Sequence, residues 1–535
     1  LPLSKEIRVV VLPFENLGPA EDEYFAAGIT DAITARLGVI RGLAVISRQS
    51  AMQYKKREKT AQQIANELRV DYILEGTVQR ERPSDPNSRV RIIPQLVKAP
   101  NDTHVWAQAY DNNMSEVFLV QSDLAERVAQ ALNIALVEPE RRALRSRPTE
   151  NMEAYDYFLR GNEYEHRGVE ENDFKIAVQM YERAVELDPK FALAYAQLSR
   201  SHAKMYWQNY DRTGQRLTMA KEAVDKALQL APDSPETHLA LGSYYYHCQW
   251  DWDRALEEFA IARRSQPNNS DLLSLIGFVQ RRQGKFDEAL ANIKRASELD
   301  PLSNYLTYEL GQTFMLMRNY PEALRCLNRA ISLAPDLFDP CNLMALLYLC
   351  WEGSTEKARA VVEEALKTVR SPEESLIIDL LITLDVYEGN YPKALDRLPL
   401  KSEDIDGQFS FIPRAIQYAG IYGYMNENEL AKKYYDEGRN ILEAKIQQQP
   451  DDARFHSTLG IAYAGLGRRE DAIREGKIGV NLLPTTKDAW RGYCRAKDLA
   501  QIYVMVGEFD SAIDQIEFLL SIPGELSIPL LRLDP

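Results

Sequence analysis

The feature that most constrains this chain is a pattern of small, bulky and proline residues that recurs every 34 residues. Successive copies place glycine, alanine and proline at the same offsets, at Gly277, Ala289 and Pro301 and then at Gly311, Ala323 and Pro335. A unit of this length accommodates two helices of about a dozen residues and their turns. Small residues let the paired helices approach closely, and proline ends the second helix. We therefore expect stacked helix pairs, that is, a solenoid, over much of the chain.

A helical repeat of 34 residues is typical of the tetratricopeptide repeat (TPR). The frame extends over residues 153–523 and gives about nine repeats, some of them degenerate. One departure is Arg318, which stands where the preceding copy has Gly284. The fold class expected for this part is an all-α, right-handed superhelical solenoid with a concave groove.

The first helix of each repeat is expected to line that groove, as it does in TPR proteins. The residues that the frame places there are mainly aromatic and basic: Tyr246, His247, Phe278, Arg281, Arg282, Tyr305, Tyr308 and Gln312. Aromatic and arginine side chains of this kind anchor protein partners. We predict that the groove binds a protein or peptide, with packing between helices as the alternative role of the tyrosines.

Residues 1–138 show a different periodicity. Runs rich in β-branched residues, such as residues 7–12, predict buried strands, and residues 22–39 repeat apolar side chains at helical spacing. Thr60 is placed to cap a second helix over residues 60–68. The predicted order βαβαβββα makes this an α/β domain with a mixed sheet and helices packed on it.

Several segments of this domain resemble a known family. The matching segments are residues 12–17, 24–30, 47–50 and 71–76, with Trp106, Tyr110, Asp111 and Gln121 further along. They are similar to the TolB-like amino-terminal domain. The resemblance implies a domain that precedes TPR repeats in the carboxy-terminal part of bacterial serine/threonine kinases, class III adenylyl cyclases and winged-helix regulators. It implies an architecture rather than an activity.

Ser47, Arg48, Gln49 and Ser50 form a polar cluster directly after a predicted strand. Open α/β sheets bind ligands beyond the ends of their strands, so these residues are a possible small-molecule cleft. Alternatively, Arg48 caps a helix or pairs with a carboxylate. A third hypothesis makes the domain a self-associating assembly module of an envelope complex.

Composition suggests where the domains end. Basic and acidic side chains balance over residues 1–150, and the remainder carries the whole net charge of −15. We predict a linker over residues 139–152 and a carboxy-terminal tail over residues 524–535. The chain begins at Leu1 and not at methionine, so we expect it to be a piece of a longer protein.

Charge and motifs argue against several classes of function. A net charge of −15 disfavours nucleic acid and anionic membranes as partners. The sequence contains no phosphate-binding loop, HExxH, GxSxG or kinase motif set, and its five cysteines have no CxxC spacing. We therefore expect no catalytic residue, no cofactor and no metal site, and no apolar run reaches the ~18 residues of a membrane span.

The combined prediction is a non-catalytic interaction, sensory or scaffolding region of a bacterial signalling protein. Its compartment stays open between two alternatives. Attachment to a membrane-anchored kinase would place it outside the cytoplasm, whereas attachment to a cyclase or DNA-binding domain without a membrane span would place it inside. The sequence leaves the oligomeric state open as well.

Overall fold

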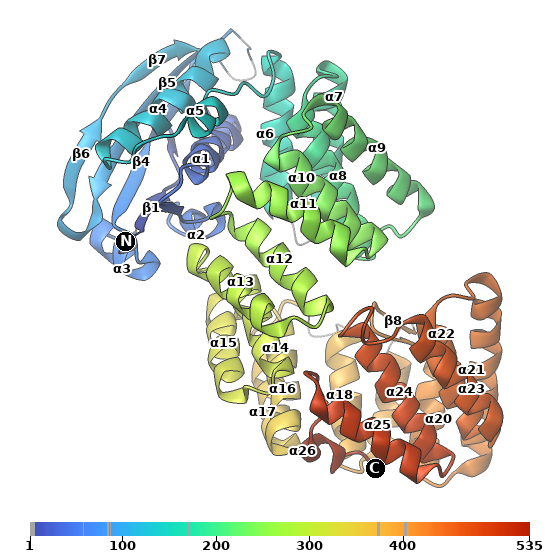
Figure 1. Ribbon diagram of the computed structural model, residues 1–535. Helices are drawn as coiled ribbons and strands as arrows, with labels where there is room; N and C mark the ends of the chain where they lie inside the picture. Colours follow the sequence, from blue (N-terminus) through green and yellow to red (C-terminus); the bar gives the residue numbers. More distant parts are fainter. Residues whose placement is uncertain are drawn as a thin grey trace. The chain divides into compact units, whose positions relative to one another are not determined.

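The computed structural model describes residues 6–56, 58–82, 85, 87–167, 171–371, 375–400 and 404–535. The chain forms two compact units, the first of residues 1–279 with 292–303 and the second of residues 280–291 with 304–535. The first unit contains the α/β domain and the first three helix pairs, the second contains the last six, and the residues of the fourth pair are divided between the two (Figure 1).

The described residues of the first unit include a mixed sheet of seven strands. The strands are β1 (Ile7–Val11), β2 (Glu15–Asn16), β3 (Leu43–Val45), β4 (Tyr72–Arg80), β5 (Arg89–Lys98), β6 (Thr103–Ala107) and β7 (Tyr110–Asn113). Their order is β3-β1-β4-β5-β6, with β2 beside β4 and β7 beside β5. β1 pairs in parallel with β3 and β4, whereas β5 is antiparallel to β4, β6 and β7. The small mixed sheet predicted at the N-terminus is confirmed.

Helices cover both faces of this sheet because successive residues of β1 point to opposite sides. Val9 and Val11 pack with α1 and α4 in one core, and Val10 packs with α3 in another. The helices of the domain are α1 (Glu23–Gly38), α2 (Arg48–Met52), α3 (Ala61–Leu68), α4 (Val117–Ala131) and α5 (Glu138–Leu144), with short 3-10 turns η1 (Ala20–Asp22), η2 (Ala99–Asn101) and η3 (Met114–Glu116).

The segment predicted as a linker, residues 139–152, is largely structured. Most of α5 lies in it, and Leu144 at the end of this helix is fully buried in the core with α1 and α4. The Leu144 carbonyl accepts hydrogen bonds from Arg36 and from Ser122 Oγ, the latter at 2.6 Å. Composition did not indicate this structure, because charged residues surround Leu144 and Met152, the two buried apolar side chains of the segment.

The rest of the described chain is built of helix pairs, ten in all against about nine predicted. One of these pairs is degenerate, with a second helix of only seven residues in α19. The pairs are α6 (Met152–Arg167) with α7 (Glu171–Leu187), α8 (Ala192–Trp207) with α9 (Gly214–Leu230), α10 (Pro235–Tyr244) and the π-helix η4 (Tyr245–Gln249) with α11 (Trp252–Ser265), α12 (Ser270–Arg282) with α13 (Phe286–Leu299), α14 (Asn304–Leu316) with α15 (Tyr320–Leu333), α16 (Asp339–Glu352) with α17 (Thr355–Ala365), α18 (Ser375–Tyr387) with α19 (Tyr391–Arg397), α20 (Arg414–Tyr424) with α21 (Asn428–Gln448), α22 (Ala453–Gly465) with α23 (Arg469–Leu482), and α24 (Arg491–Met505) with α25 (Phe509–Ser521).

Three short elements complete the second unit: η5 (Leu398–Leu400), the two-stranded pair β8 (Ile405–Asp406) with β9 (Phe411–Ile412), and α26 (Ile528–Leu531). The last of these corrects the prediction of a tail over residues 524–535. Ser527 Oγ donates a hydrogen bond to the Cys350 carbonyl at 2.5 Å, and Leu530 packs against the core of α16 and α18. The carboxy-terminal residues dock because Leu530 and Leu533 bury apolar surface there.

No helix among the described residues combines the length and the apolar character needed to cross a membrane.

Candidate functional site

The residues predicted to line a groove are mostly buried. Five of the eight are buried side chains: Tyr246, His247, Phe278, Arg281 and Arg282. Of the others, Tyr305 is 51% exposed, whereas Tyr308 and Gln312 are half-buried. The five buried side chains contribute to packing, which corrects the expectation that they face a ligand.

Arg281 and Arg282 are buried because their guanidinium groups are engaged inside the second unit. Arg281 Nη2 lies 2.6 Å from Glu309 Oε2, and Arg282 Nη1 lies 3.6 Å from Asp488 Oδ2. Both guanidinium groups also lie over the ring of Trp490, at 4.6 and 5.0 Å from its centroid. An arginine in this position stabilises the contact between helices by charge pairing and stacking on the aromatic ring.

His247 and Tyr246 are buried in an aromatic cluster of the first unit. The His247 ring lies 5.1 Å from Trp207 and 4.7 Å from Tyr246, and Tyr246 lies 5.7 Å from Trp252. Burial, together with the nearby positive charges of Lys204 and Arg200, lowers the pKa of His247 to about 3. The imidazole is therefore neutral at physiological pH. Among the described residues, no group of three or more metal-ligating side chains is placed to hold a metal ion.

The polar cluster Ser47–Ser50 lies at the start of α2 and contacts the helix pairs. Ser47 caps α2, since its side chain accepts a hydrogen bond from the Ser50 amide at 3.3 Å. Arg48 Nε lies 2.5 Å from Asp31 of α1, and Arg48 Nη2 lies 3.0 Å from Glu163 of α6. Gln49 is exposed. Pairing of Arg48 with carboxylates, the alternative role named above, is what the structure shows.

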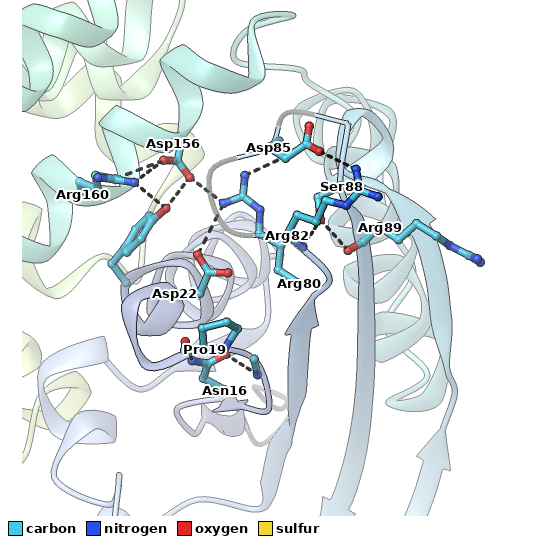
Figure 2. A network of polar contacts seen from close by, with 12 residues as sticks. Asn16, Pro19, Asp22, Arg80, Arg82, Asp85, Ser88, Arg89, Asp156 and Arg160 are labelled. Carbon is cyan, nitrogen blue, oxygen red and sulfur yellow. Dashed lines mark hydrogen bonds and ion pairs between the residues drawn. The ribbon is translucent and has the colours of Figure 1, made fainter.

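Figure 2 shows a second set of contacts between the α/β domain and α6, centred on Arg80 at the end of β4. Arg80 Nη1 lies 2.9 Å from Asp156 of α6 and 3.9 Å from Asp22. The Tyr24 hydroxyl donates to the same Asp156 carboxylate at 2.7 Å, and Arg160 contacts it as well, at 3.1 Å. Burial raises the pKa of Asp22, although the Arg80 charge acts against this rise.

Apolar packing accompanies these polar contacts. A Cβ atom added at Gly28 of α1 would lie 2.7 Å from the Leu159 side chain of α6, so any larger residue there would force Leu159 to shift. Phe118 of α4 meets Tyr155 of α6 edge-on, with ring centroids 4.7 Å apart. The core of the α/β domain is therefore continuous with that of the first helix pair.

The α/β domain also contacts the chain just after α13. Ser50 Oγ donates to Asp300 Oδ1 at 2.5 Å and accepts from the Leu302 amide at 2.9 Å. Arg295 Nη2 of α13 lies 2.6 Å from Glu6 Oε1, and Glu6 is the residue that precedes β1. The domain thus bridges the first and the fourth helix pair within the first unit.

Between these contacts lies a group of charged side chains that we call the junction cluster. Its members are Asp31, Arg48, Glu163, Glu165, His166, Arg200, Lys204 and Asp271. Lys204 Nζ lies 2.7 Å from Glu165 Oε1, Arg200 pairs with Asp271, and His166 Nδ1 lies 3.9 Å from Asp31. The cluster therefore joins α1 and α2 of the α/β domain to the first helices of three helix pairs, α6, α8 and α12.

The charges of the junction cluster sustain one another. Burial alone would raise the pKa of Glu165, but the charges of Lys204 and Arg200 hold it at about 2. Burial raises the pKa of Asp31 to about 6, even though Arg48 opposes the rise. Three members stay accessible to solvent: the side chains of Asp271, His166 and Lys204 are 51%, 43% and 34% exposed. The arrangement can recognise a charged segment of a partner, since these three groups offer both signs of charge and donors as well as acceptors.

Sequence reasoning named Arg48 but missed the other members of the junction cluster. One signal in the sequence could have indicated them. The repeat frame places Glu165, Arg200 and Lys204 on the first helices of their repeats, α6 and α8. Their pairing across different repeats was not accessible, because the frame predicts positions on a helix and not the partner that each position meets.

A family model described as tetratricopeptide repeat matches residues 277–337. The matched segment covers parts of α12 and α14 and the whole of α13 and α15. The chain therefore contains tetratricopeptide repeats, and it is a scaffold of the type that binds other proteins.

Two curated relatives illustrate the range of similar proteins. The chain is 31% identical over 254 residues to a Rhizobium meliloti protein named putative adenylate cyclase 3, a match that covers 47% of this chain and 41% of that protein. It is 24% identical over 227 residues to anaphase-promoting complex subunit 3 of Schizosaccharomyces pombe, covering 40% and 32%. The matches thus span less than half the length of either relative.

Solved structures give a similar range. The TPR protein YrrB is 24% identical, with a TM-score of 0.25, over 36% of this chain and 91% of YrrB. The type IV pilus biogenesis factor PilW is 20% identical, with a TM-score of 0.35, over 43% of this chain and 99% of PilW.

Proposed function

We propose that this chain is the non-catalytic sensory and scaffolding region of a bacterial signalling protein. The repeats bind a protein or peptide segment at the open side chains of the junction cluster. The amino-terminal domain is of the TolB-like kind, and it transmits the binding state or docks a second partner.

The observation that carries this proposal is the double attachment of the α/β domain to the repeats. It contacts α6 through Arg80 and Arg48, and it contacts residues 295–302 through Glu6 and Ser50. A ligand that changes the spacing of the first four helix pairs must therefore strain or release one of these attachments. Such a coupling is what a sensory region requires, since an effector acts only through differential contacts in two states.

The signalling role is supported by the similarity to the putative adenylate cyclase of Rhizobium meliloti, which extends over 254 residues. Because the match covers 41% of that protein, the remaining part of the relative has room for a separate domain. We propose that this chain acts as the corresponding non-catalytic part of its own protein.

The test selects peptides that bind the chain from a random 16-residue peptide library and then measures their affinity for variants. His166→Ala with Asp271→Ala removes two solvent-accessible members of the junction cluster. The matched control is His104→Ala with Asp225→Ala, a pair of exposed residues outside the cluster. We expect the first variant to weaken binding by about tenfold and the control to leave it unchanged. Equal affinities for both variants would show that the peptides bind elsewhere and would overturn the proposal.

A further inference from the structure

Helix α25, the second helix of the last pair, presents an apolar stripe to solvent. Phe509 is 63% exposed and Ile513 is 54% exposed. Ile516 and Leu520 continue the stripe at helical spacing and are half-buried against the core around Tyr493. The stripe therefore begins in the core of the second unit and ends in water.

An exposed stripe at this position needs an explanation. The last repeat of a solenoid normally has a polar outer face, because no further repeat covers it. Here the chain that follows α25 turns away, since Ser527 bonds the Cys350 carbonyl and α26 packs on α16. Single exposed apolar residues are common, but two large ones in successive turns of one helix form a surface that favours a partner.

The charged side chains of α25 itself are all acidic. Asp510, Asp514 and Glu517 are exposed on the same helix, and none of them makes an ion pair within the described part of the chain. Glu508 is already paired with Arg469. No lysine, arginine or histidine occurs between Lys497 and Arg532. The apolar stripe is thus bordered by three carboxylates that lack a partner.

We propose that this face of α25 docks a basic amphipathic helix of a partner protein. The apolar side of such a helix covers Phe509 and Ile513, and its lysine or arginine side chains pair with the neighbouring carboxylates. A second copy of this chain fits less well, because it would bring two acidic faces together. The surface belongs to the second unit, and the proposal does not depend on the junction cluster.

The experiment titrates the full chain into a fluorescein-labelled 18-residue peptide of leucine and lysine with the leucines on one helical face, followed by fluorescence anisotropy. One variant is Phe509→Ser with Ile513→Ser, and another is Asp510→Lys with Asp514→Lys. Since all four residues are exposed, these changes remove surface contacts only. The matched control is Leu119→Ser with Val137→Ser, which removes apolar residues of the α/β domain that are 51% and 47% exposed. A second peptide, with glutamine in place of leucine, measures the purely electrostatic part.

Both α25 variants are expected to weaken binding of the leucine–lysine peptide about tenfold, while the control variant binds like the unchanged chain. The glutamine peptide is expected to bind at least about tenfold more weakly. Equal binding to the α25 variants and the control would overturn the proposal. A dimer of the unchanged chain in light scattering would also overturn the proposal if Phe509→Ser with Ile513→Ser converted it to a monomer. The surface would then be occupied by a second copy of this chain.

Discussion

At the scale of single residues, the junction between the α/β domain and α6 depends on buried charges. Arg80 is surrounded by Asp22 and Asp156 and is almost fully buried. Removing one partner of such a group is costly, because the remaining charges stay in a region of low polarity without compensation. The same carboxylates would be harmless at the surface, where water solvates them.

Replacing Arg80 by methionine tests this dependence. The change keeps an unbranched, largely apolar side chain but leaves Asp22 and Asp156 without their shared cation, so we expect a loss of about 3–5 kcal/mol. Arg89→Met is the matched control. Arg89 begins β5, the strand that follows Arg80, and forms an exposed ion pair with Asp111, which should contribute less than about 1 kcal/mol to the free energy of unfolding. Thermal unfolding followed by circular dichroism measures both. Similar melting temperatures for the two variants would contradict the assigned role of Arg80.

His247 makes the stability of the first unit depend on pH. Its pKa is about 3 in the folded chain, lowered first by burial and then by Lys204 and Arg200, against about 6.5 in an unfolded chain. Below pH 6.5 the unfolded chain gains a proton that the folded chain does not, so stability falls as the pH falls toward 3. Between pH 6.5 and 5 the loss from this group is about 2 kcal/mol.

We therefore expect His247→Phe to reduce the drop in melting temperature between pH 7 and pH 5. Phenylalanine keeps the contact with Trp207 but binds no proton. The control His104→Phe changes an exposed histidine of β6 and should retain the full drop of the unchanged chain. A drop of the same size in both variants would mean that His247 does not titrate in this range.

At the scale of helices and strands, local signals in the sequence were reliable. Thr60 was expected to cap a helix, and its side chain accepts a hydrogen bond from the Gln63 amide at 3.3 Å. The cap is predictable because both residues lie within one turn. Arg48 shows the opposite case. Its partner Glu163 lies 115 positions away, and no periodicity links the two.

Boundaries were harder to predict than elements. Residues 139–152 and 524–535 lack long apolar runs, yet each docks through a few apolar side chains, which are Leu144 and Met152 in the first and Leu526, Leu530, Leu531 and Leu533 in the second. Whether such a residue finds a pocket depends on the whole fold, which composition does not describe. The prediction that Arg281 faces a ligand failed for the same reason. Arg281 contacts Glu309 and Trp490 only once the second unit has folded, and the sequence does not show these contacts.

Substitutions at two glycines of α1 distinguish the effect of helix packing on stability from the effect of helix propensity. Gly28→Ala would place a methyl group 2.7 Å from the buried Leu159 side chain of α6, whereas Gly38→Ala would meet nothing within 4 Å. Alanine favours the helix by up to about 1 kcal/mol at either position, so the difference between the variants reports the contact with α6. We expect Gly38→Ala to be neutral or stabilising and Gly28→Ala to cost about 1–3 kcal/mol. Equal unfolding free energies, measured by urea titration, would show that α1 does not pack tightly on α6.

At the scale of the whole molecule, the second unit is joined between its last and its first repeats, unlike a linear solenoid in which each repeat contacts only its neighbours. Arg318, between α14 and α15, donates hydrogen bonds to the carbonyls of Leu519, Ile522 and Leu526, at 2.9 to 3.2 Å. The Gly524 amide donates to the Leu316 carbonyl at 2.8 Å. This closure explains why an arginine occupies a turn position where the preceding repeat has glycine.

The closure yields a prediction in which two effects of one substitution oppose each other. Arg318 has a left-handed backbone, with φ of +58°, and Arg318→Gly would relieve about 1–2 kcal/mol of strain. The same change removes charged hydrogen bonds of about 1.5–3 kcal/mol each, so the loss should dominate. Asn426→Gly is the control, because Asn426 has φ of +59° in a corresponding turn but its side chain makes no hydrogen bond within the described part of the chain. Hydrogen exchange of the amides in residues 524–531 should quicken about tenfold in Arg318→Gly alone. Unchanged exchange in that variant would mean that the apolar contacts of Leu530 hold the carboxy-terminal segment without the arginine.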